Sequence, residues 1–209
     1  MKRLYFIRHG ETEWNKLNRI QGCSDVELNN TGVWQAERIA YRLKDEKFDL
    51  ILSSNLKRAY DTAKKIIQYH PNAEFKTNDL IREIEFGSWE GLTIDQLKDN
   101  YLEQYKIWRE NPEIAIFPGE RSLSNVKKRV EEFINTIMKI DKKRIAIVTH
   151  GGIIKLSVII LLELDLSFYK KCWFGNTSLT IIDIKDNKRI ISVLNDMSHL
   201  HLEQMKPLL

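Results

Sequence analysis

Two short, mainly apolar runs of the chain each end close to a histidine that is followed by a glycine. Residues 4–7 lead into Arg8 and His9, and residues 144–148 lead into His150. Runs rich in β-branched and aromatic residues predict buried strands. Open α/β sheets bind their ligands at the carboxyl ends of their strands. We therefore expect both histidines at one edge of a sheet.

Strands and helices are predicted to alternate along most of the chain. This alternation indicates a mostly parallel sheet between two layers of helices, which is a three-layer α/β/α sandwich. The turn at Asp186 and Asn187 adds a late antiparallel hairpin at one edge. We expect one domain over residues 1–209. The predicted strands are residues 2–7, 48–53, 75–78, 144–148, 179–184 and 189–193, and the predicted helices are residues 31–43, 56–67, 94–109, 122–140 and 153–164.

The composition is that of a globular protein without a nucleic-acid-binding stripe. Hydrophobic residues make up 43% and charged residues 30% of the 209 positions, and basic and acidic residues are interleaved. The net charge of +4 favours anionic substrates. No apolar run approaches the roughly 18 residues of a membrane span, and Cys23 and Cys172 suggest no disulfide framework. We expect a cytoplasmic protein that binds neither nucleic acid nor membrane, and we leave open whether it is a homodimer.

The residues that follow the first strand suit an oxyanion. Arg8 offers a rigid fork of donors, His9 offers a nucleophilic or basic imidazole, and Gly10 lets the backbone approach a ligand. The longer string Arg-His-Gly-Glu-Thr at residues 8–12, followed by Asn15, resembles the signature of the histidine phosphatase superfamily. That family contains cofactor-dependent phosphoglycerate mutases and many small-molecule phosphatases. The resemblance also implies the three-layer fold.

Two further positions match the pattern of this family. An arginine that opens a helix, as Arg58 does, is more often solvated, but the resemblance implies that Arg58 is the second phosphate-binding arginine. His150 alone could be a core histidine, and the resemblance implies that it is the second histidine of the site, beside the phosphate-binding amide of Gly151. The resemblance also implies that Asn15 binds the phosphate. It implies that the rest of the substrate contacts Gln21, Gly22 and Asn176.

A glutamate-rich segment, residues 80–91, resembles the part of the family that supplies a proton donor. By position, the resemblance implies that Glu83 is the donor. Glu85 and Glu90 remain competitors, although both could also be surface or ion-paired carboxylates. The sequence alone does not remove them.

The resemblance implies that phosphomonoesters react through a phosphohistidine. His9 would attack phosphorus, and Glu83 would protonate the leaving oxygen. Arg8, Arg58 and His150 would surround the remaining phosphate oxygens. Because the arginines supply the positive charge that magnesium supplies elsewhere, we expect neither a metal nor another cofactor.

Three other histidines are predicted to lie outside the site. His199 and His201 form a His-x-His pair that we expect to be exposed rather than metal-binding, because short motifs often match by chance. His70, which precedes Pro71, is also expected at the surface.

Within the family, the sequence favours a phosphatase that acts on small phosphorylated metabolites. Glu83 and His150 are separated by 150 − 83 = 67 positions, whereas the mutases carry a longer insertion there, and residues 86–91 look like the phosphatase branch. A phosphoglycerate mutase is the runner-up. An α-ribazole-phosphate phosphatase often has tyrosine where Gln21 stands, so a broad-specificity enzyme is favoured over it. A catalytically silent binding protein would lack a main site residue, and none is missing.

Residues 93–121 are open to two interpretations. Their predicted helix carries an aromatic stripe of Tyr101, Tyr105 and Trp108, which either packs on the core or forms a helical lid over the site. After this helix, many relatives have Gly-Gly-Glu-Ser where this chain has Pro-Gly-Glu-Arg-Ser. The extra residue, Arg121, either changes specificity or faces solvent.

Overall fold

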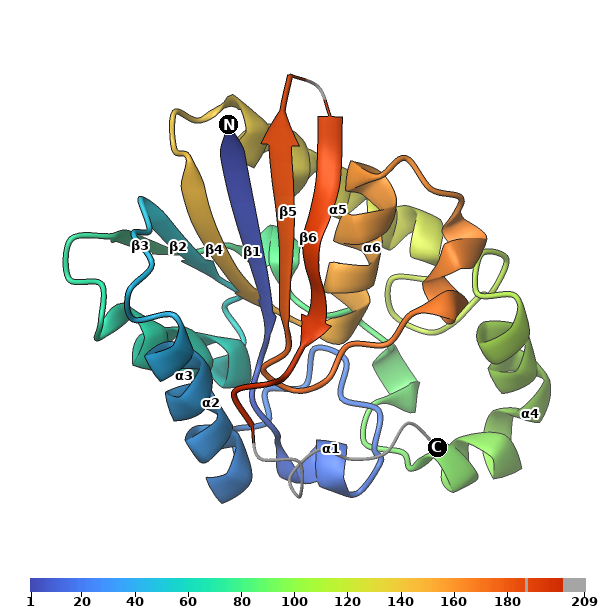
Figure 1. The fold of residues 1–209 in the computed structure, drawn as a ribbon. Helices are drawn as coiled ribbons and strands as arrows, with labels where there is room; N and C mark the ends of the chain where they lie inside the picture. Colours follow the sequence, from blue (N-terminus) through green and yellow to red (C-terminus); the bar gives the residue numbers. More distant parts are fainter. Residues whose placement is uncertain (187, 201–209) are drawn as a thin grey trace.

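The computed structural model of the protein describes residues 1–186 and 188–200 and contains a six-stranded sheet (Figure 1). The order across the sheet is β3 (Glu74–Thr77), β2 (Leu50–Ser53), β4 (Arg144–Thr149), β1 (Lys2–Arg8), β5 (Leu179–Lys185) and β6 (Lys188–Asp196). The first four strands in this order are parallel, and the last two form an antiparallel pair at one edge. The predicted fold class is confirmed.

Helices cover both faces of the sheet, with α2 (Asn30–Arg42) and α3 (Lys57–Ile67) on one face and α5 (Leu123–Lys139) and α6 (Gly151–Leu161) on the other (Figure 1). Successive residues of a strand point to opposite faces. Leu4 and Phe6 of β1 accordingly pack in the same apolar cluster as residues of α5 and α6. Tyr5 and Ile7 pack with residues of α2 and α3. β1 is thus buried on both sides, as its unbroken apolar sequence predicts.

The carboxyl ends of three parallel strands meet at one edge of this sheet. In the sheet register Arg8 lies opposite Thr149, and Ser53 lies opposite Val148. The backbone amide of His9 donates to the Thr149 carbonyl oxygen at 2.9 Å. Helices α3 and α6 begin just beyond the same edge, so their unpaired amides also gather there. Both predicted histidines lie at this edge.

Most predicted helices begin within two residues of the prediction, and the starts of α2 and α3 show the local cause. The helix expected from Thr31 begins one residue earlier, at Asn30. The side chain of Asn29 caps this helix by accepting a hydrogen bond from the Gly32 amide. Helix α3 has no side-chain cap, although Ser53 and Ser54, which precede it, are of a residue type that commonly caps helices. Instead, the Ser54 hydroxyl oxygen accepts from the Leu56 amide, ahead of the helix, and also contacts a histidine described below.

The segment between β3 and α5 contains η1 (Asp79–Ile81), η2 (Gly87–Trp89) and α4 (Ile94–Glu110), which is kinked at Tyr101. Figure 1 shows α4 apart from the helices that cover the sheet. Trp108 of α4 packs its ring against those of Phe86, Phe117 and Tyr169, with centroid distances of 5.3, 5.2 and 5.6 Å. The aromatic stripe therefore contacts the main apolar core, as one of the two interpretations expects.

Arg121 lies in a tight turn between α4 and α5. Its φ of 71° is in the left-handed region, and its carbonyl oxygen accepts a hydrogen bond from the Phe117 amide at 3.0 Å. The residue is exposed. These facts fit the interpretation in which Arg121 faces solvent.

The surface prediction is wrong for His70 and His199. His70 is 6% exposed, and its ring lies 4.8 Å from that of Phe48, because the loop after α3 folds back onto the core. His199 is 9% exposed, and its Nε2 atom lies 3.1 Å from the Thr177 hydroxyl. His201 lies outside the described residues.

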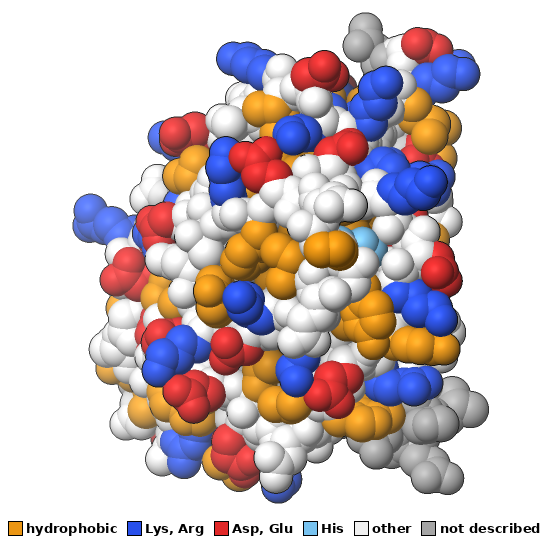
Figure 2. Space-filling model, turned by 90° about the vertical axis from the view of Figure 1, so that its left-hand side faces the viewer, with side chains coloured by type: hydrophobic (Ala, Val, Ile, Leu, Met, Phe, Trp, Pro, Cys, Tyr) orange, Lys and Arg blue, Asp and Glu red, His pale blue; other side chains and the backbone are white. Residues whose placement is uncertain are grey.

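The surface carries mixed charge. Figure 2 shows basic and acidic side chains interleaved on one face of the molecule, and the ion pair of Lys65 with Glu37 joins α3 to α2. Cys23 and Cys172 are free thiols. Among the described residues, no helix is long and apolar enough to cross a membrane.

Candidate active site

His9 follows β1 directly and is 2% exposed. Its Nδ1 atom lies 2.7 Å from the Gly10 carbonyl oxygen, and because a carbonyl only accepts, Nδ1 carries the proton. The Nε2 atom then keeps its lone pair, which accepts a hydrogen bond from Nε of Arg58 at 3.3 Å. The ring is therefore held as the neutral tautomer, with its unprotonated nitrogen beside a guanidinium group.

Arg58 is fully buried in the first turn of α3. Its two terminal nitrogens donate to the carbonyl oxygens of Ser24 and Gly22 at 2.8 and 2.7 Å. Gly22 has a φ of +54°, and a Cβ atom there would lie 2.1 Å from a carboxylate oxygen of Glu90. This position therefore requires glycine. Gly22, predicted on the substrate side, contributes the carbonyl that orients Arg58.

Arg8 and Gly151 lie beside each other at the start of α6. A Cβ atom on Gly151 would be 3.6 Å from Nε of Arg8. Arg8 donates through Nη1 to the Phe174 carbonyl oxygen at 2.7 Å, while its buried Nε finds no hydrogen-bond partner in the described part of the chain. Gly151 opens the helix, where amides lack intrahelical acceptors. Both groups are suited to an anion.

His150 is fully buried and is the N-cap residue of α6. Its ring centroid lies 5.1 Å from that of His9. The Nε2 atom lies 2.8 Å from the Ser54 hydroxyl oxygen, whereas Nδ1 is buried without a hydrogen-bond partner among residues 1–186 and 188–200. The contact of Ser54 with this histidine was not predicted, since serines after a strand commonly cap helices instead.

The two imidazoles are held neutral by their surroundings. Burial, followed by the positive charge of Arg58, lowers the pKa of both His9 and His150 well below the usual value of 6.5. Burial lowers the pKa of Arg8 to about 10, and it also lowers that of Arg58. Both arginines therefore remain cationic near neutral pH, and they add positive potential to a site with little solvent.

Glu83 reaches the same helix terminus from the segment between η1 and η2. Its Oε2 atom accepts a hydrogen bond from the Gly152 amide at 3.3 Å, and its Oε1 atom accepts from the amide of Ile84 at 3.0 Å. A Cβ atom on Gly152 would lie 2.5 Å from Oε1 of Glu83, so glycine is needed for this approach. The carboxyl group thus lies within two residues of His150 and remains partly exposed.

The structure separates Glu83 from its two competitors. Glu90 is a structural carboxylate, since its oxygens accept from the amides of Cys23 and Ser24 at 3.0 and 2.9 Å and tie the loop that holds Arg58. Glu85 is exposed. Of the three glutamates, Glu83 is the one that contacts the start of α6.

Asn15, Asn176 and Gln21 lie around this cluster. The Asn176 side chain donates to the His9 carbonyl oxygen at 3.1 Å and to Oδ1 of Asn15 at 3.2 Å. Asn15 lies in the short helix α1 (Glu13–Lys16), and its Oδ1 also accepts from the amide of Thr12, the N-cap residue of that helix. Gln21 is 9% exposed, and its Oε1 is buried with no hydrogen-bond partner in the described ranges. The two asparagines therefore support the backbone of His9.

Sequence reasoning missed Arg129 of α5, which holds the Glu83 segment in place. Arg129 forms two parallel hydrogen bonds with the carboxylate of Glu120, at 2.8 and 2.9 Å. The same guanidinium donates to the carbonyl oxygens of Leu80, Arg82 and Glu83, at 2.7, 2.9 and 3.4 Å. No local signal marks Arg129, because charged residues on amphipathic helices are usually solvated.

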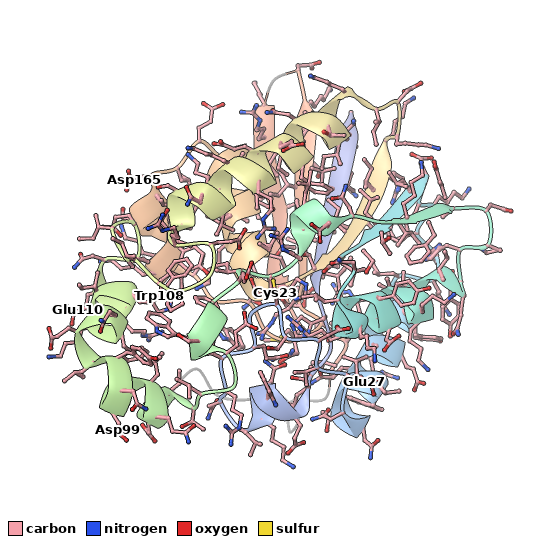
Figure 3. All side chains as sticks on the ribbon, turned by 180° about the vertical axis from the view of Figure 1, so that it is seen from behind. Cys23, Glu27, Asp99, Trp108, Glu110 and Asp165 are labelled. Atoms are coloured by element: carbon pink, nitrogen blue, oxygen red, sulfur yellow. The ribbon has the colours of Figure 1, made fainter. Side chains whose placement is uncertain are left out.

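The site is cationic and imidazole-rich. Figure 3 labels Trp108 on α4 and Cys23 in the loop between α1 and α2. Burial raises the pKa of the Cys23 thiol to about 12, so the thiol remains protonated. No group of three or more histidine, cysteine or acidic side chains suited to a metal ion occurs within the described ranges.

Comparison with known proteins identifies the family. Residues 4–197 match the histidine phosphatase superfamily (branch 1). The chain is 34% identical to phosphoserine phosphatase 1 of Hydrogenobacter thermophilus over 96% of this chain and 95% of that protein. It is also 34% identical to a metal-independent phosphoserine phosphatase of Arabidopsis thaliana, over 94% and 82% of the two chains. Other relatives carry phosphoglycerate mutase names.

A similar solved structure is that of a mutant phosphoserine phosphatase from Entamoeba histolytica in complex with phosphoserine. It is 34% identical and has a TM-score of 0.84 over 96% of this chain and 100% of that chain. The same enzyme has been solved with 3-phosphoglyceric acid.

Proposed function

The chain belongs to the histidine phosphatase superfamily (branch 1), and we propose that phosphoserine and related small phosphomonoesters are its substrates. It is a metal-independent phosphoric monoester hydrolase that works through a phosphohistidine. The observation that carries the assignment of its site is a pair of buried nitrogen atoms without hydrogen-bond partners around His9. Arg8 Nε and His150 Nδ1 are both buried, and neither has a hydrogen-bond partner within the described residues. Phosphate oxygens would satisfy both.

In the first step, the Nε2 lone pair of His9 attacks phosphorus, and the bond between phosphorus and the ester oxygen breaks. The departing oxygen takes the proton of the Glu83 carboxyl group and leaves as an alcohol. Arg8, Arg58 and the Gly151 amide neutralise the charge on the phosphoryl oxygens. The hydrogen bond that Arg58 makes to Nε2 is then replaced by one to phosphate.

In the second step, water attacks the phosphohistidine. The Glu83 carboxylate accepts a proton from this water, and the bond between phosphorus and Nε2 breaks, so that inorganic phosphate leaves. His9 recovers its neutral form and Glu83 its proton. The Gly10 carbonyl, by keeping the proton on Nδ1, holds the ring ready for the next turnover.

Phosphoserine is the first substrate to be tested because relatives that cover nearly the whole chain are named for it. A phosphoglycerate mutase is the alternative, since relatives with that name also exist. A mutase must protect its phosphoenzyme from water, which favours a longer closing segment. The 67 positions between Glu83 and His150 favour hydrolysis.

Residues 93–121 are further proposed to cover the leaving-group side as a lid within the single domain. Support comes from Trp108, whose contacts with Phe86 and Tyr169 join α4 to the Glu83 segment and to the residues after α6. Trp108→Leu is expected to change the ranking of substrates by a few-fold, through KM. An unchanged ranking would leave α4 as core packing alone.

Cytoplasmic location and a homodimer stay predictions, and light scattering of the purified chain would test the homodimer.

The proposed function is tested by incubating the native protein with phosphoserine, 3-phosphoglycerate and α-ribazole phosphate in the presence of a chelator. We expect phosphate release, with phosphoserine or 3-phosphoglycerate preferred. Conversion of 3-phosphoglycerate to 2-phosphoglycerate without net phosphate release would favour the mutase. Binding without any turnover would favour a silent protein.

A further inference from the structure

Lys155 lies one turn into α6, on the helix face that begins at the site. Residues three and four apart on a helix share a face, so Lys155 is on the same side as Gly151 and Gly152. Those two glycines face Arg8 and Glu83, respectively. The lysine therefore belongs to the same helix as the proposed anion-binding amides, and it lies one turn beyond the N-terminus of that helix.

Tyr169, in η3 (Leu166–Lys171), connects Lys155 to the proposed proton donor. The Lys155 ammonium lies 4.6 Å from the centroid of the Tyr169 ring. The hydroxyl of Tyr169 and Oε1 of Glu83 would lie 3.0 and 2.5 Å from a Cβ atom built on Gly152, so these two oxygens are close to each other. Tyr169 is 6% exposed and packs against Trp108. The ammonium group is thus held by a ring whose hydroxyl adjoins the Glu83 carboxyl group.

Lys155 is a cation without a carboxylate partner. Within residues 1–186 and 188–200, no aspartate or glutamate lies at ion-pair distance from it, and its ammonium group lies over the Tyr169 ring. Lys155 is only partly exposed, and burial lowers its pKa. Removing a cation from water without a counter-charge is unfavourable. A bound anion would supply the missing charge.

Other cations near Lys155 are paired with carboxylates, exposed, or part of the phosphate side. Arg82 lies 2.9 Å from a carboxylate oxygen of Asp79 and 3.6 Å from one of Glu120. Arg109 is exposed on α4. Arg8 and Arg58 are among the residues proposed above to bind the phosphate. Among the described residues, Lys155 is therefore a partly buried cation near Glu83 that has no ion-pair partner.

We propose that the Lys155 ammonium binds a carboxylate on the leaving group, with Tyr169 holding it in position. This inference rests on the proposed function, because it assumes that Glu83 protonates the ester oxygen. In phosphoserine and 3-phosphoglycerate the carboxylate is attached to the carbon next to the one that bears the phosphate ester. An ammonium group near the proton donor is therefore suited to such leaving groups and gives no advantage to a phosphomonoester that lacks the carboxylate.

Two substrate pairs isolate the carboxylate. Glycerol 3-phosphate replaces the carboxylate of 3-phosphoglycerate by an alcohol, and phosphoethanolamine is phosphoserine without its carboxylate. In Lys155→Met, which keeps an unbranched side chain against the Tyr169 ring, we expect kcat/KM for the two carboxylate substrates to fall about 10- to 100-fold, mainly through KM. Glycerol 3-phosphate and phosphoethanolamine should change by less than about 2-fold, which also shows that the variant is folded.

Two further variants complete the test. Lys155→Arg should recover part of the lost affinity, and Lys65→Met, which removes a lysine of the α2–α3 surface, should leave all four substrates unchanged. The inference is overturned if Lys155→Met affects both members of each pair equally, or affects neither, while the native enzyme prefers the carboxylate substrates. If the native enzyme hydrolyses none of the four, the proposed function itself fails.

Discussion

The two sides of the site are built in different ways. The proposed phosphate side lies at the ends of central strands and at helix starts, and it consists of His9, Arg58, His150, Arg8 and Gly151. The side chains of His9, Arg58 and His150 are almost completely buried. The proposed leaving-group side comes from segments outside the sheet, namely residues 79–121 and η3, together with Lys155 of α6. Many residues of α4 are exposed.

This difference separates reaction from specificity. Strand register and backbone hydrogen bonds fix the phosphate side, so its geometry depends on the whole core. The leaving-group side depends on side-chain packing and on local anchors such as Arg129. Changes there should alter which substrate reacts, whereas changes on the phosphate side should abolish the reaction for every substrate.

The largest expected effect is on the phosphate side. His9→Ala removes the proposed nucleophile, and we expect kcat to fall by roughly 10³-fold or more for every substrate. Steady-state phosphate release measures this, with thermal unfolding as the check on folding. A fall confined to some substrates would contradict the division between the two sides.

A smaller and substrate-dependent effect is expected for Glu83→Gln. Loss of the proton donor should reduce kcat for phosphoserine by roughly 10²-fold. The aryl ester p-nitrophenyl phosphate has a leaving group that needs no proton, so its first step should be much less affected. Equal losses for both esters in kcat/KM, which reports the first step, would remove Glu83 from the role of general acid. Glu85→Gln, on an exposed residue, is the matched control.

Arg129→Met tests whether a residue without substrate contact positions Glu83. Loss of its hydrogen bonds to the segment should lower kcat for phosphoserine about 10-fold, because small misplacements of catalytic groups are costly. The p-nitrophenyl ester should again be less affected. A purely structural role would lower the melting temperature and the activity on both esters together.

The smallest effect is on stability at acidic pH. The pKa values of His9 and His150 are lowered in the folded state, so below pH 6.5 the unfolded chain binds protons that the folded chain does not. The free energy of unfolding should therefore fall as the pH is lowered from 7.5 to 5. Urea unfolding at these two pH values checks the sign, and His150→Gln should flatten the dependence. A stability that rises towards pH 5 would show that these histidines are not held neutral.

The same contrast explains what the sequence could reveal. The strands and the positions of His9 and His150 follow from short apolar runs and the chemistry at their ends, which are local features. Glu90 could not be distinguished from Glu83 in advance, because its role depends on amides of a loop more than 60 positions earlier in the chain. Arg129 was missed for the same reason, and so was the burial of His70, which depends on a ring that comes from another segment.

The central claim is that His9 carries the phosphoryl group during turnover. The most direct measurement mixes the enzyme with phosphoserine that is radiolabelled at phosphorus, in the presence of a chelator, and then quenches the reaction rapidly without acid. Peptide mapping at alkaline pH, where phosphohistidine survives, then locates the label. The account predicts label on the peptide that contains His9, and none in His9→Ala. Label on another residue, or turnover in His9→Ala at the native rate, would contradict it.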